Sequence, residues 1–114
     1  MTYEEKINWL FRYREAERLY QRLSYRLAEA QEATRHITQN LSAAPGGSKD
    51  GQSLARAVER EEEAERRAYA QLAVLDALFA EIDAVLVQLD SAEYCALRKY
   101  YLCLLYTSDA ADEA

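Results

Sequence analysis

The chain has 114 residues, half of them hydrophobic, with three Gly, one Pro and a formal net charge of −6. This composition favours one ordered domain, and the shortage of turn-forming residues excludes a strand-based fold with many turns. The negative charge excludes general polyanion binding by the whole chain, because nonspecific affinity for nucleic acid depends on clustered Lys and Arg. With neither a basic-then-apolar leader nor a long apolar stretch, the sequence predicts a cytoplasmic protein.

A first helical arm is expected over about residues 3–41. Thr2 and Glu5 have the spacing of a capping box, which predicts a helix start near Tyr3. Side chains then recur at alternating steps of four and three, the heptad spacing of a coiled coil. This seam contains Trp9, Tyr13, Ala16, Tyr20, Leu23, Leu27, Ala30, Thr34, Ile37 and Leu41. The segment 42–52, rich in Ser and Gly and containing the only Pro, is expected to be a loop.

The heptad spacing returns after this loop and predicts a second arm over about residues 53–90. Its seam contains Leu54, Val58, Glu61, Glu65, Ala68, Leu72, Leu75, Phe79, Ile82, Leu86 and Leu89. We expect Glu61 and Glu65 to lay their aliphatic stems on the seam near the loop, with the carboxylates in water. Arms of equal length joined by a short loop predict an antiparallel hairpin over residues 1–90.

The charges support the antiparallel pairing, which places residue i of the first arm near residue 95 minus i of the second. The acidic residues of the facing stretch are Asp76, Glu81, Asp83 and Asp90, and the arginines opposite them are Arg12, Arg14, Arg18, Arg22 and Arg26. Four of these residues, Arg14, Arg18, Arg22 and Arg26, form a stripe with i, i+4 spacing, which we interpret as neutralised within the hairpin rather than as a nucleic-acid contact.

A short third helix is expected over residues 91–102. Asp90 and Glu93 have a second capping-box spacing, and the apolar or amphipathic residues Tyr94, Leu97, Arg98, Tyr101 and Leu102 follow at helical intervals. We expect this helix to fold back near Trp9, Phe11 and Tyr13. The predicted fold class is therefore all-α: a long antiparallel two-helix coiled-coil hairpin plus a short third helix.

A hairpin buries one stripe on each arm and leaves other apolar side chains uncovered. These residues are Ile7, Leu10, Phe11, Leu19, Val74, Leu78 and Val85. Helices in water owe their stability mainly to packing of the apolar face, so a third helix or a second copy should cover them. We expect self-association or a protein partner through the hairpin, and no membrane partner.

The residue types needed for catalysis or metal binding do not occur at useful spacings. His36 is the only histidine, and Cys95 and Cys103 match no metal or redox spacing. The acidic run 61–63 lacks the Glu-x-x-His elements of a di-metal bundle, and the segment 45–49 lacks phosphate-loop spacing. We predict that the chain is not an enzyme and has no cofactor and no catalytic, cofactor-binding or metal site.

The order of elements and several short motifs resemble a family of phage and prophage proteins. The motifs are the loop Pro45, Gly46, Gly47, Ser48 with Asp50 after it, and the later residues Leu89, Asp90, Tyr94, Leu97, Arg98, Tyr100 and Tyr101. The chain is similar over roughly residues 1–102 to late-transcription regulators of the ArpU and RinA type. The resemblance implies that residues 93–101 open a helix-turn-helix like region four of a sigma factor. No recognition helix follows Tyr101, so no residue is assigned to base reading.

The segment 103–114 resembles the translation of a transposase-type sequencing adapter. We expect this tail to be non-native and residues 91–102 to be the first helix of a truncated helix-turn-helix. The chain is then a fragment of a phage-type transcription regulator, with a hairpin for oligomerisation or partner binding and DNA as a partner of the full-length protein only. The alternative is a coiled-coil interaction or assembly protein with no nucleic-acid role.

Overall fold

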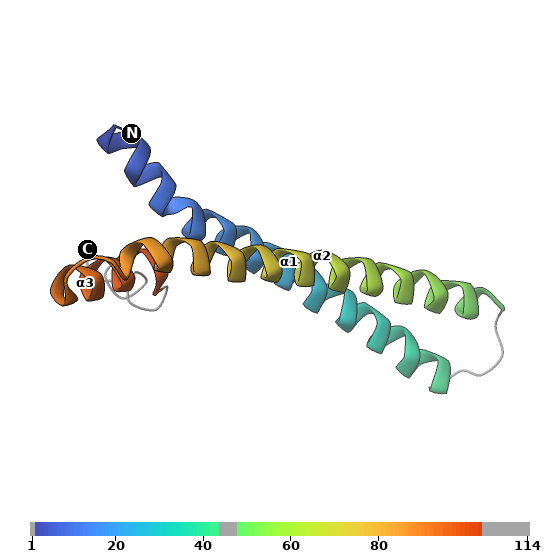
Figure 1. The fold of residues 1–114 in the computed structure, drawn as a ribbon. Helices are drawn as coiled ribbons and strands as arrows, with labels where there is room; N and C mark the ends of the chain where they lie inside the picture. Colours follow the sequence, from blue (N-terminus) through green and yellow to red (C-terminus); the bar gives the residue numbers. More distant parts are fainter. Residues whose placement is uncertain (1, 44–47, 104–114) are drawn as a thin grey trace. The chain divides into compact units, whose positions relative to one another are not determined.

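The computed structural model describes residues 2–43 and 48–103 and contains three helices (Figure 1). They are α1 (Tyr3–Ala43), α2 (Ser48–Leu86) and α3 (Ser91–Leu102), and the described residues contain no strand. The prediction of an all-α helical hairpin with a short third helix is confirmed. The loop residues 44–47 and the tail residues 104–114 lie outside the described part, as does everything predicted for them.

Both predicted helix starts have the expected side-chain cap, and the complete capping box with reciprocal bonds forms at α1. At α1, the Thr2 amide donates to Glu5 Oε2 at 3.2 Å and the Glu5 amide donates to Thr2 Oγ1 at 3.1 Å. At α3, the Glu93 amide donates to Asp90 Oδ1 at 2.9 Å. Each bond satisfies an amide that has no acceptor within its own helix.

The ends of α2 differ from the prediction. This helix begins at Ser48, five residues before the expected start at 53, because Ser48 and Asp50 suit a helix amino terminus and Gly51 accepts helical geometry at modest cost. It ends at Leu86 rather than at 90. The amides of Gln88 and Leu89 bond to carbonyls only three residues back, which tightens the chain into a turn before α3.

The structure divides into two compact units. The terminal unit combines the segments that precede Leu19 and follow Gln71, and the middle unit is Leu19–Gln71. Each unit contains an antiparallel pair of segments from α1 and α2, and the terminal unit also contains α3.

The terminal unit has an apolar core to which all three helices contribute. Ile82, Leu86 and Leu102 are buried at its centre. The partly buried residues packed against them are Trp9, Leu10, Tyr13, Phe79, Tyr94 and Leu97. The Phe11 ring meets the Tyr101 ring edge-on, with the centroids 5.2 Å apart. Helix α3 therefore folds back onto the aromatic residues of α1, as predicted.

The pairing of α1 with α2 in the terminal unit is antiparallel but shifted from the predicted register. Arg12 was expected opposite residue 83, and its Nη2 lies 2.8 Å from Glu81 Oε1. Tyr13 was expected opposite Ile82, and its ring packs on Phe79 at 6.0 Å between centroids. The burial of Ile82 at the core sets this register, whereas the prediction assumed symmetry about the loop.

The seam of α1 is as predicted, and that of α2 is corrected at two positions. Every predicted seam residue from Trp9 to Ile37 is half-buried. On α2, Val58 is exposed and Ala57 is buried in its place. Leu89 is exposed because α2 has already ended. Glu61 and Glu65 are half-buried, as expected for long side chains lying along a seam.

Candidate functional site

An open groove runs between α1 and α2 within the middle unit. It has a volume of about 740 Å³, and its floor consists of Leu and Ala side chains between charged rims. The lining residues are Leu23, Arg26, Glu29, Ala30, Ala33, Arg56, Glu59, Arg60, Glu63, Ala64 and Arg67. The groove exists because the facing positions are mainly alanines, whose single methyl group does not fill the space between two helix backbones.

A smaller hollow of about 240 Å³ shares part of this lining. It extends to Ile37 on α1 and Ser53 on α2, and it is also lined by Ala57. Ala30 and Ala33 line both spaces. The incomplete packing therefore continues along the helix pair.

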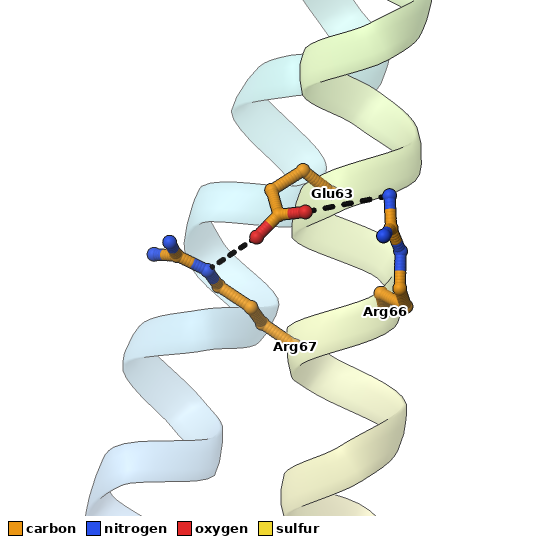
Figure 2. Close-up of polar contacts among 3 residues, drawn as sticks. All are labelled: Glu63, Arg66 and Arg67. Carbon is orange, nitrogen blue, oxygen red and sulfur yellow. Dashed lines mark hydrogen bonds and ion pairs between the residues drawn. The ribbon is translucent and has the colours of Figure 1, made fainter.

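Glu63 is held in place on the rim by two arginines of its own helix (Figure 2). Its Oε1 accepts from Arg67 Nε at 3.0 Å, and its Oε2 lies 3.3 Å from Arg66 Nη2. The acid precedes both bases by three or four residues, the order that suits a helix. These side chains are at least half exposed, so each pair contributes only about 0.5 kcal/mol or less.

Other rim charges have no ion pair among the described residues. They are Arg26 and Glu29 on α1, and Arg56, Glu59 and Arg60 on α2. The predicted neutralisation of the arginine stripe is thus wrong for Arg26, whose surroundings in the described chain offer it no acidic contact. The rim presents charges of both signs to whatever enters the groove.

Arg12, which precedes the stripe, pairs as predicted with an acidic residue of the facing stretch, Glu81. Its guanidinium also lies 5.1 Å from the centre of the Trp9 ring, and its Nε donates to the Trp9 carbonyl at 3.2 Å. The contact with Glu81 is an ion pair without the geometry of a directed hydrogen bond. Arg12 therefore links α1 to α2 within the terminal unit.

Arg14 has a different role from the one predicted, because it binds α3 rather than an acid. Its guanidinium carbon lies 4.8 Å from the centre of the Phe11 ring and 4.9 Å from that of Tyr100. Its Nη2 donates to the Tyr100 carbonyl at 2.7 Å. That carbonyl is in the last turn of α3, where no amide of the same helix is available to donate to it. Arg14 therefore caps α3 from α1.

Asp83, Tyr94 and Arg98 form a polar cluster between α2 and α3. The Tyr94 hydroxyl donates to Asp83 Oδ1 at 2.7 Å, and Arg98 Nη1 donates to the Tyr94 oxygen at 2.6 Å. The bond to Asp83 is the main cause of the raised pKa of Tyr94. Arg98 also lies over the Phe79 ring at 5.3 Å. The sequence did not predict this cluster, because it placed Arg98 only among the amphipathic residues of the third helix.

The remaining chemistry-bearing residues are separate from one another. His36 is exposed on α1 beside a shallow hollow that also involves Tyr25 and Glu32. Cys95 and Cys103 are exposed, and neither forms a disulfide among the described residues. Within the part of the chain that the structure describes, no three His, Cys, Asp or Glu side chains are grouped so as to hold a metal ion.

Comparison of the chain with protein-family models, curated proteins and solved structures gives no match. Across the described residues, none of the helices is both long enough and apolar enough to pass through a bilayer. The groove of the middle unit is the feature whose geometry suits binding of another molecule.

Proposed function

We propose that the hairpin is an association element, used for oligomerisation or for binding a helical protein partner. The observation that carries this proposal is the state of the α1 seam. Its residues have coiled-coil spacing, yet all those from Trp9 to Ile37 remain half-buried rather than buried. A seam of this kind gains stability when a further helix covers it.

Apolar side chains beside the seam support the same function. On α2 of the terminal unit, Val74 is 44% exposed and Val85 is 49% exposed, with the half-buried Leu78 on the same helix face. These were among the residues expected to lack cover from a hairpin alone. Ile7, Leu10 and Phe11 were also among them, and they are half-buried in the terminal unit.

Sedimentation equilibrium of the full chain tests the association. We expect the apparent mass to rise with concentration above that of one chain. A second test places a photo-crosslinker at the seam residue Leu23 or Leu27 and looks for a captured helical partner in cells. The proposal is contradicted if the chain stays monomeric at every concentration and also captures no such partner.

We further propose that this element serves a phage-type transcription regulator of the ArpU and RinA type. The support is the sequence resemblance together with the helical state of residues 93–101, the segment that the resemblance assigns to the opening of the helix-turn-helix and that lies within α3. Sequencing the source gene across the codon for Leu102 tests this. We expect an apolar helix pair with a basic recognition helix after Tyr101, and a stop codon or an unrelated helix contradicts it.

One observation favours the alternative of an assembly protein with no nucleic-acid role. Tyr101 and Leu102 are buried in the terminal unit, and Arg98 is bound by Tyr94 and lies 3.9 Å from Asp83. In this alternative α3 completes the core of the helix bundle. The same gene sequence separates the two candidates.

A further inference from the structure

The smaller hollow of the middle unit differs from the larger groove in the charges of its lining. The acidic residues of the larger groove, Glu29, Glu59 and Glu63, do not line the hollow. The charged side chains that do line it are Arg56 and Arg60, both on α2. The larger groove therefore has charges of both signs, whereas the hollow has positive charges alone.

Neither of these arginines is paired with an acid within the described residues. Both are exposed, and neither forms an ion pair in this part of the chain. Glu63, three residues after Arg60, is bound by two arginines of the next turn (Figure 2). Glu59, three residues after Arg56, forms no ion pair with it. Both guanidinium charges are therefore available to an anion that enters the hollow.

Hydrogen-bond donors from three side chains lie in a row on the α2 side of the hollow. Ser53 precedes Arg56 by three residues, and Arg56 precedes Arg60 by four. Residues three or four apart on a helix are neighbours, with their β-carbons about 5–6 Å apart. A guanidinium offers a planar fork of N–H donors, and a serine hydroxyl adds one more donor. The row therefore suits a group with several negatively charged oxygen atoms.

A phosphate group matches this row of donors better than a carboxylate does. One arginine fork satisfies both oxygens of a carboxylate. A phosphate monoester has three terminal oxygens and a charge of about −1.5 to −2 near neutral pH. Two guanidiniums and a hydroxyl supply donors for all three oxygens and offset this charge. The donors therefore favour a phosphate over a carboxylate.

The rest of the hollow is lined by apolar side chains. Ala30, Ala33 and Ile37 line it from α1, and Ala57 lines it from α2. These side chains offer no hydrogen bond to a polar ligand, whereas contact with an apolar group removes their surface from water. The volume of about 240 Å³ is below the range of about 300–1,000 Å³ that is usual for pockets with drug-sized ligands. The hollow therefore suits a small apolar group beside the phosphate.

We propose that the hollow binds a phosphate group that is carried on a small apolar group. Ser53, Arg56 and Arg60 hold the phosphate, and Ile37 and the alanines contact the apolar group. The proposal is independent of the association of the hairpin, because the hollow is formed within one chain. It is also distinct from general binding of polyanions, which the net charge of −6 disfavours.

Titration of the ¹⁵N-labelled full chain with phenyl phosphate tests the proposal. NMR spectra record the Nε–H signals of the arginine side chains, and we expect those of Arg56 and Arg60 to shift and then saturate. Inorganic phosphate lacks the apolar group, and benzoate lacks the phosphate. At constant ionic strength, each should bind at least about fivefold more weakly than phenyl phosphate.

A pair of substitutions removes the two forks and a matched pair serves as the control. Arg56→Gln with Arg60→Gln should raise the dissociation constant for phenyl phosphate about tenfold or more, and glutamine is about as good a helix former as arginine. Arg18→Gln with Arg22→Gln alters two exposed arginines with the same spacing that line neither the groove nor the hollow. This control should stay within about twofold of the unchanged chain. Circular dichroism of both variants confirms that the helices are retained.

Each result of these titrations supports or overturns the proposal. Saturable shifts of Arg56 and Arg60 that disappear with their own substitution, and persist in the control, support it. Equal weakening by the two pairs of substitutions indicates general attraction to surface charge and overturns the site. Benzoate or inorganic phosphate that binds as tightly as phenyl phosphate overturns the choice of ligand. Arginine signals that do not shift at millimolar phenyl phosphate overturn the proposal as a whole and leave the association function standing.

Discussion

Replacing Ile82 by Ala should destabilise the terminal unit more than any other single truncation on α2. Ile82 is 0% exposed and lies with Leu86 and Leu102 at the centre of the core. Truncations of buried Ile to Ala cost about 2–5 kcal/mol, and the loss grows with the cavity that remains. Since all three helices pack around Ile82 and cannot all move inward, we expect about 3–4 kcal/mol, and about 1 kcal/mol for Ile82→Val.

Urea unfolding followed by Trp9 fluorescence measures this effect. Trp9 is the only tryptophan and packs against the same core, so it reports on the terminal unit. Val85→Ala is the control, because Val85 is on the same helix and is 49% exposed. It should lower the free energy of unfolding by about 0.5 kcal/mol or less, as for a surface position. Equal losses for Ile82→Ala and Val85→Ala would refute the three-helix core.

Two further predictions concern α3 and the tyrosines of the terminal unit. Asp90→Ala removes the acceptor of the Glu93 amide and should lower the free energy of unfolding in urea by about 1 kcal/mol. Asp90→Ser keeps an acceptor and should retain most of the stability. Equal losses for the two variants contradict the cap. Burial raises the pKa of Tyr13 and of Tyr101 above the ordinary 10.0, so the folded state favours their neutral forms. Their contribution to stability is complete below pH 10.0 and is lost as the pH rises through the folded pKa values. Tyrosinate absorbance and Trp9 fluorescence should change together during an alkaline titration. The prediction is contradicted if the free energy of unfolding stays constant from about pH 9 to pH 11.5.

The helices and their caps were predictable because their signals are local. The heptad spacing predicted both arms, and capping boxes at Thr2 and Asp90 marked two of the helix starts. The α2 seam near the loop was predicted less well, since Ala57 is buried there and Val58 is exposed. A straight helix has 3.6 residues per turn, so a strict seven-residue repeat drifts around it by about 20° per heptad. After several heptads the inward position moves to the neighbouring residue.

The roles of the arginines could not be predicted from facing charges. The facing acidic residues gave a wrong partner for Arg14 because they leave α3 out of account. This helix places the carbonyl and the ring of Tyr100, which is 86 residues later in the sequence, against Arg14. Cation–π contacts contribute about 0.5–2 kcal/mol when they are shielded from water, whereas an exposed ion pair contributes about 0–1 kcal/mol. The guanidinium of Arg14 is therefore stabilised more by the partly buried aromatic rings than it would be by an exposed carboxylate. Arg98 follows the same rule with Phe79 and Tyr94.

The residue types on the seam explain why the two units differ. In the terminal unit the seam contains large side chains such as Trp9, Phe79 and Ile82, which fill the space between the helices and form a core within one chain. In the middle unit much of the seam is Ala, which favours the helix as strongly as any residue but leaves the interhelical space open. In the middle unit, therefore, the residues that favour helix formation do not also fill the space between the helices. The terminal unit has the packing that fixes its fold, and the middle unit retains an open groove with Leu and Ala side chains in its lining.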